Sequence, residues 1–163
     1  MTRSLTVLAL VLSPACAADQ SSAAADPPGD SAAIITAEVH DFLGRYVTVM
    51  NAVDTAALRT LYVADDRFSW VEDGDVRYES ADAVIKALGQ FAGSSTATTS
   101  WGESEVTPLP PSTAAVRTGF RTGLGPEQGN YEFGGMITMV LEQRDGAWRI
   151  VTGHTSTERQ RGN

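Results

Sequence analysis

The pattern of apolar residues divides this 163-residue chain into a helical first part and a second part that shows only strand patterns. From Ile35 to Val53, apolar residues recur alternately four and three positions apart, which places them on one face of a helix. After Gly93 the sequence has no comparable stretch. An amphipathic helix must bury its apolar face against another layer, so the two parts are expected to pack together as one domain.

Two shorter helices and a β-hairpin are predicted between these two parts. Asp54 and Ser80 are typical helix caps, and apolar residues at helical spacing follow each of them. Residues 67–71 and 76–78 are β-prone and are separated by an Asp-Gly turn signal.

The second part contains four strand-prone stretches at 100–107, 114–122, 130–143 and 148–157. Consecutive strands joined by short turns predict an antiparallel meander. The expected fold class is α+β, with a cone-shaped, curved antiparallel sheet covered by the long N-terminal helix and two shorter helices. The concave, mostly apolar space between the helix and the sheet is the default ligand site.

Residues 1–18 have the features of a secretory signal peptide. Arg3 supplies the positive charge, 5–12 is a short apolar run, and small residues follow at 15–17. An eight-residue helix spans about 12 Å, well short of the ~30 Å hydrocarbon core of a bilayer. We therefore expect an exported protein with a disordered tether over 19–30 and a folded domain over 31–160.

Cys16 is the single cysteine of the chain, and it follows the apolar run where bacterial lipoproteins carry their lipid. The alternative is a plain signal peptidase site with an incidental cysteine. The expected location is thus the periplasm or the cell surface as a lipoprotein, or the medium as a secreted protein. Membrane contact is expected only through a lipid on Cys16.

The charge pattern argues against several classes of partner. The formal net charge is −8 and the sequence has no basic stripe, which disfavours nucleic acid. With two histidines and no cysteine in the mature domain, neither a metal site nor a cofactor is expected. The acidic residues between 65 and 75 lack the spacing of a calcium loop and are interpreted as a helix end and a solvated turn.

The order of elements, together with the closing pattern Trp-x-Ile-x-x-x-His-x-Ser at 148–156, resembles the nuclear transport factor two-like superfamily, in particular its SnoaL-like members. The resemblance covers residues 34–158. It implies an α+β cone, often a homodimer packed through the outer sheet face. It also implies a pocket that serves isomerases, cyclases and hydratases, and domains that only bind, so the fold alone does not fix the function.

Ketosteroid isomerase is the mechanistic template that the resemblance offers. Its chemistry needs a carboxylate base, a tyrosine and a protonated carboxylic acid. The resemblance matches the tyrosine to Tyr46, the base to Val71 and the second acid to the region of Thr138 or Met139. Two of the three roles fall on residues without an acid, which argues against this activity.

His154 and Tyr46 are the catalytic candidates. On a regular strand His154 shares a face with Trp148 and Thr152, where it could act as an acid or base near neutral pH. The alternative is a structural histidine. The Tyr46 hydroxyl either reaches a ligand in the cavity or finds a partner in the core.

The aromatic residues Trp70 and Trp101 either form a wall around a ligand or belong to the core. The family placement turns Ser69 and Val71 toward the cavity, whereas hydrophobicity turns Phe68 and Trp70 inward, and both arrangements stay open. The predicted ligand-binding residues are Tyr46, Trp70, Trp101, Thr138, Thr152 and His154.

Three functions are compatible with the sequence. The first is binding of a small, largely apolar molecule in the cone cavity. The second is an acid–base enzyme of the isomerase, dehydratase or cyclase type that uses His154 and Tyr46. The third is a dimeric interaction module whose cavity is plugged by Trp70, Phe91 and Met139.

Overall fold

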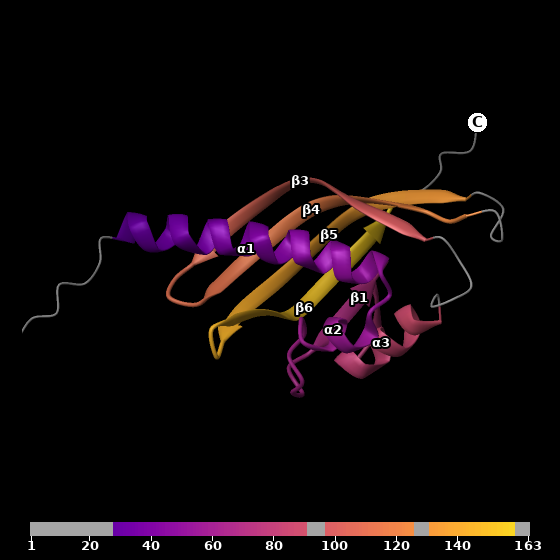
Figure 1. Ribbon diagram of the computed structural model, residues 1–163, viewed down its shortest axis with the longest axis horizontal. Coiled ribbons are helices and arrows are strands. Elements are labelled where there is room, and N and C mark those ends of the chain that lie inside the picture. The colour runs from indigo at the N-terminus through magenta and orange to yellow at the C-terminus, as the bar shows by residue number, and fades with distance from the viewer. Residues whose placement is uncertain (1–27, 91–96, 126–130, 159–163) are drawn as a thin grey trace, which may run out of the picture.

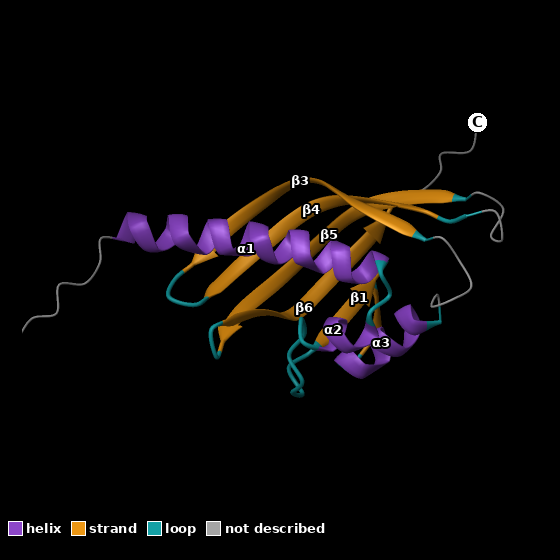
Figure 2. Ribbon diagram, viewed as in Figure 1, coloured by secondary structure: helices purple, strands orange, loops and turns teal. Residues whose placement is uncertain are grey.

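The computed structural model describes residues 28–90, 97–125 and 131–158. The described elements, in chain order, are α1 (Pro28–Asn51), α2 (Thr55–Arg59), β1 (Ser69–Glu72), β2 (Asp75–Tyr78), α3 (Ala81–Gly89), β3 (Thr98–Leu109), β4 (Thr113–Gly123), β5 (Glu132–Arg144) and β6 (Ala147–Thr157) (Figures 1 and 2). The predicted signal peptide with Cys16, most of the predicted tether, and Phe91 lie outside the described residues.

The helices begin where the sequence chemistry favours it. The α1 helix starts at Pro28, earlier than the predicted boundary at residue 31, and proline is well tolerated in a first helical turn because its missing N–H would be unpaired there. The Asp54 side chain accepts a hydrogen bond from the Ala57 N–H at 3.0 Å and starts α2. Ser80 does the same for α3 through the N–H of Ala83 at 3.3 Å.

The six described strands form one sheet in the order β2-β1-β6-β5-β4-β3. The predicted antiparallel meander is confirmed for β3 to β6. The sheet also contains a parallel pair that the sequence did not predict, because β1 pairs with β6. Parallel neighbours need a crossover, and the whole segment from β2 through β5 provides it.

The helices cover the concave face of this sheet. Figure 1 shows α1 running across the long strands, with α2 and α3 beside β1 at the other end of the sheet. The side chains of Ile35, Val39, Phe42 and Tyr46 on α1 are almost fully buried against the sheet. The predicted apolar stripe of α1 therefore covers the core. Ile34, next to this stripe, is 57% exposed.

A bulge in β6 decides which of its side chains face the helices. Leu141 pairs with Ile150 and the preceding Val140 pairs with Thr152, so Val151 is an extra residue in β6. One extra residue moves all later side chains of a strand to the opposite face. Before the bulge, Trp148 and Ile150 face inward. After the bulge, the residues that face inward are those that would face outward if the strand were regular.

Candidate functional site

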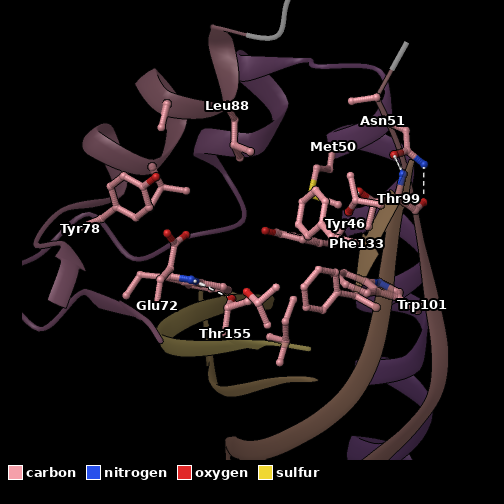
Figure 3. A pocket seen from close by; sticks show the side chains of 18 of the residues that line it. Tyr46, Met50, Asn51, Glu72, Tyr78, Leu88, Thr99, Trp101, Phe133 and Thr155 are labelled. Atoms are coloured by element: carbon pink, nitrogen blue, oxygen red, sulfur yellow. Dashed lines mark hydrogen bonds between the residues drawn. The ribbon is translucent and has the colours of Figure 1, made fainter. Parts of the chain in front are cut away.

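A cavity of about 390 Å³ lies between the helices and the concave face of the sheet (Figure 3). This size is within the usual range of small-molecule pockets, roughly 300–1,000 Å³. Side chains from α1, α3 and every described strand contribute to its lining. Its aromatic lining residues are Tyr46, Tyr62, Trp70, Tyr78, Trp101, Phe120 and Phe133.

Two tyrosines form the deep, buried end of the cavity. The hydroxyl oxygens of Tyr46 and Tyr62 are 2.7 Å apart and share a hydrogen bond, and the two residues are 4% and 2% exposed. The Tyr46 ring stacks on Trp101 with centroids 5.8 Å apart, and the Trp101 indole N–H donates to the Leu43 carbonyl at 3.1 Å. Packing thus holds the Tyr46 ring in place, and the shared hydrogen bond links the Tyr62 hydroxyl to it.

The tyrosine pair has a spare hydrogen-bond donor. One hydroxyl donates to the other, so one O–H remains, and neither hydroxyl has another partner among the described residues. Burial raises the pKa of Tyr46 and raises that of Tyr62 well above its ordinary value, so both hydroxyls keep their protons. The deep end therefore offers a neutral donor to an acceptor atom in the cavity.

Two carboxylates stand at the end of the cavity that reaches solvent. Glu72 lines it with a side chain that is 40% exposed, and the exposed Asp73 follows. Burial raises the pKa of the Glu72 carboxyl, Asp73 adds to this, and Arg77 opposes it. Figure 3 shows Glu72 and Tyr78 on one side of the pocket, with Trp101 and Phe133 on the other.

Three of the predicted ligand-binding residues line the cavity, namely Tyr46, Trp70 and Trp101. The parity of β1 follows hydrophobicity, since Phe68 and Trp70 are buried. The Trp70 indole N–H donates to the Thr155 hydroxyl at 3.2 Å, which fixes its ring in the wall. Trp70 thus forms part of the lining instead of plugging the space, and Met139 lies in the core outside the lining.

The prediction that His154 faces the cavity with Tyr46 is wrong. His154 is exposed and lies in β6 between Gly153, which contacts the Trp70 ring, and the cavity-lining Thr155, so its side chain is on the opposite face. The bulge at Val151 is the reason, because it inverts the alternation that the prediction assumed.

Thr138 and Thr152 also lie outside the cavity lining. Thr138 is exposed and pairs with His154 on the outer face of the sheet. The Thr152 hydroxyl is 3.0 Å from both the hydroxyl and the carbonyl of Ser69 and ties β6 to β1. Neither threonine therefore reaches the cavity.

Sequence reasoning missed Tyr62 and Glu72, two of the polar residues that line the cavity. The run of acidic residues predicts a solvated turn for Glu72. It lies two residues after Trp70 and so shares its face, which makes it predictable once Trp70 is placed inward. Tyr62 has no comparable signal, because it follows the short helix α2 and its position depends on a bridge to Ile150.

Within residues 28–90, 97–125 and 131–158, no cluster of three or more metal-ligating side chains occurs. In the same segments no helix has both the length and the apolar character needed to cross a bilayer.

Residues 32–154 match the family model of the SnoaL-like domain. The chain belongs to this SnoaL-like family. The match spans both the helical layer and the meander, so the whole cavity lies in the family domain. Among curated proteins no sequence matches this SnoaL-like chain.

Several solved structures share this fold at low sequence identity. A protein of unknown function from Mycobacterium tuberculosis has a TM-score of 0.71 at 18% identity and aligns over 83% of this chain and 78% of its own. A putative scytalone dehydratase from Novosphingobium aromaticivorans has a TM-score of 0.71 at 13% identity, over 80% and 89%. A nuclear transport factor 2-like protein from Salmonella enterica has a TM-score of 0.68 at 14% identity, over 80% and 95%. At these identities the likeness shows the SnoaL-like α+β cone fold alone.

Proposed function

We propose that this SnoaL-like protein binds a small, largely apolar molecule in the cone cavity and that the buried tyrosine pair holds an acceptor atom of that molecule. The observation that carries the proposal is the spare O–H of Tyr46 and Tyr62 at the deep end of a cavity of about 390 Å³. A buried donor without a partner costs roughly 1–3 kcal/mol, and a ligand oxygen would remove that cost.

The shape of the lining supports an apolar body for this ligand. Trp70, Trp101, Phe120 and Phe133 present aromatic surface, while Ile137 and Leu88 add aliphatic surface. Such walls bind through burial of apolar area, and the few polar groups fix the orientation of the ligand.

Native mass spectrometry of the purified protein tests this proposal most directly. We expect a co-purified molecule of a few hundred daltons that is lost or weakened in the double variant Tyr46→Phe/Tyr62→Phe, which removes both hydroxyls and so the spare donor. The same spectrum reports whether the protein is a homodimer, as the family resemblance implies. A protein that carries no ligand, and that binds none of a panel of oxygen-bearing aromatic probes, would contradict the proposal.

An acid–base enzyme of the isomerase, dehydratase or cyclase type is the second candidate. It is favoured by Glu72, whose raised pKa and position across the cavity from a neutral hydroxyl donor suit proton transfer next to a carbonyl. Glu72 replaces His154 in this role.

The test is deuterium incorporation beside the carbonyl of a small cyclic ketone in D₂O, followed by NMR. Catalysed exchange that Glu72→Gln abolishes would support it, and exchange at the buffer rate would exclude it for that ketone class.

Export is proposed on the sequence alone. Metabolic labelling with palmitate, compared between the full-length protein and Cys16→Ser, separates a lipoprotein from a plainly cleaved secreted protein. Label that depends on Cys16 would support lipidation.

A further inference from the structure

The charged groups that line the cavity are all of one sign. Glu72 and Asp73 are its charged lining residues, and the lining contains no lysine, arginine or histidine among the described residues. Both carboxylates lie at the solvent-reaching end, away from the tyrosine pair. An anionic ligand would meet repulsion there and find no cation to pair with.

Arg77 forms only a loose ion pair with Glu72. The Arg77 Nε atom lies 3.7 Å from a Glu72 carboxylate oxygen, beyond the length of a normal hydrogen bond, and the Arg77 side chain is 65% exposed. Such exposed ion pairs are weak because water screens them. Asp75, which pairs with Glu72 in the hairpin, adds negative charge on the same side.

Aromatic rings stand beside these carboxylates. Trp70 precedes Glu72 on the same face of β1, and Tyr78 pairs with Trp70 across the hairpin. The faces of tryptophan and tyrosine rings attract cations through their quadrupoles. A carboxylate combined with aromatic faces in a partly closed cavity is the chemistry that recognises an organic ammonium group.

We propose that the ligand is a protonated organic amine with an apolar body, whose ammonium group is held by Glu72 and Asp73 beside Trp70 and Tyr78. The other end of the molecule reaches the spare donor of Tyr46 and Tyr62 and therefore carries an acceptor such as an ether or carbonyl oxygen. This inference rests on the proposed binding function and specifies its ligand class.

Three probes with the same body test the charge preference by titration calorimetry at neutral pH. They are 6-methoxy-2-naphthylmethylamine, (6-methoxy-2-naphthyl)methanol and 6-methoxy-2-naphthoate, which are a cation, a neutral molecule and an anion. We expect the amine to bind about tenfold more tightly than the alcohol, a difference of about 1.4 kcal/mol, and the naphthoate to bind most weakly. Equal or tighter binding of the alcohol or the naphthoate would overturn the inference.

Matched variants separate the local carboxylate from the net charge of the protein. In Glu72→Gln the amine should lose most of its tenfold advantage, while the affinity for the alcohol stays the same and so reports an intact cavity. Glu103→Gln removes the same charge at an exposed position of β3 outside the lining and should leave all three affinities unchanged. A loss in Glu103→Gln equal to that in Glu72→Gln would show a general charge effect and would refute a site at Glu72. If none of the three probes binds, the inference on the ligand class is overturned, and the proposed binding function fails with it only where the purified protein also carries no ligand.

Discussion

The hydroxyls of Tyr46 and Tyr62 determine each other's hydrogen bonding. Each is almost fully buried, and their mutual hydrogen bond leaves one donor and the remaining acceptor capacity inside the cavity. Buried polar groups are nearly always paired in proteins, so an unpaired one at a cavity wall points to something that binds there. The pair is thus both part of the core and part of the proposed site.

The two tyrosines should be coupled energetically. We expect Tyr46→Phe and Tyr62→Phe each to lower the free energy of unfolding by about 1 kcal/mol, because each leaves the other hydroxyl buried without a partner. The double variant should cost less than the sum, because it leaves neither hydroxyl behind. Chemical denaturation of the parent protein, the two single variants and the double variant measures this coupling. Strictly additive losses would show that the hydrogen bond at 2.7 Å does not contribute to stability.

Glu72 should make stability depend on pH in a defined direction. Its pKa is raised by burial and by Asp73, with Arg77 opposing, while Asp75 and Tyr78 are its other neighbours. A raised pKa means that ionisation costs stability in the folded state. The cost is absent below the ordinary carboxyl pKa and is fully present above the raised one. Glu72→Gln should therefore raise the Tm at pH 7 but not at about pH 3, measured by thermal melts. A higher Tm of equal size at both pH values would contradict this explanation.

At the scale of elements, strand bulges limit what the sequence can predict. The strands themselves follow from their β-prone stretches, and their observed bounds differ from the predicted ones by a few residues. The face that each side chain occupies does not follow, because the register shifts beside Trp70, Trp101 and Val140 depend on the pairing of distant strands. Trp70 and Trp101 are predicted from their aromatic character and Tyr46 from its place on the helical stripe, whereas the placement of His154 assumes a regular strand.

Gly153 shows how closely β1 and β6 fit around Trp70. A Cβ at Gly153 would overlap atoms of the Trp70 six-membered ring. Gly153→Ala is therefore expected to lower the free energy of unfolding by about 1–3 kcal/mol, since the ring must leave its place in the wall. In a Trp70→Leu background the same substitution should cost clearly less. Denaturant melts of the four proteins test this, and an undiminished cost would place the clash elsewhere.

Gly44 on α1 provides the opposite case. It is exposed, and no heavy atom apart from its own helix lies within 4 Å of the place that a Cβ would occupy. Gly44→Ala should raise the free energy of unfolding by about 0.5–1 kcal/mol, because alanine loses less backbone entropy in a helix. The expected result is a higher denaturation midpoint with an unchanged slope. A lower midpoint would mean that this surface of α1 has a contact that the monomer does not show.

At the scale of the whole molecule, the cavity exists because two layers meet along one side and diverge along the other. The α1 helix packs on β3 and β4, while α2 and α3 lie at the β1 end of the sheet (Figure 1). The space between these contacts is the cavity. Its general position and the inward-facing Tyr46 were predictable from the amphipathic helix and the meander, but the placement of Tyr62 required the bridge to Ile150.

Asn51, the last residue of α1, connects the two layers beside the cavity. Its side-chain amide donates to the Thr99 carbonyl at 2.8 Å, and its side-chain oxygen accepts from the Thr99 N–H at 2.8 Å, so the helix end takes the place of a neighbouring strand at the edge of β3. Both residues line the cavity. Because the pair is exposed, each hydrogen bond contributes modestly, and Asn51→Ala should lower the free energy of unfolding by about 1 kcal/mol.

The same substitution should have a local effect that global stability does not report. The Thr99 amide of Asn51→Ala is expected to exchange its hydrogen much faster, because the side chain was its acceptor, while the amides of β4 and β5 keep their protection. A ligand in the cavity should then bind more weakly, since it must hold the helix end and the strand edge together itself. Hydrogen exchange of the unliganded variant tests whether the helix end holds the edge of β3. If the Thr99 amide stays as protected as in the parent protein, the sheet alone holds this edge, and the helix end does not help to close the cavity.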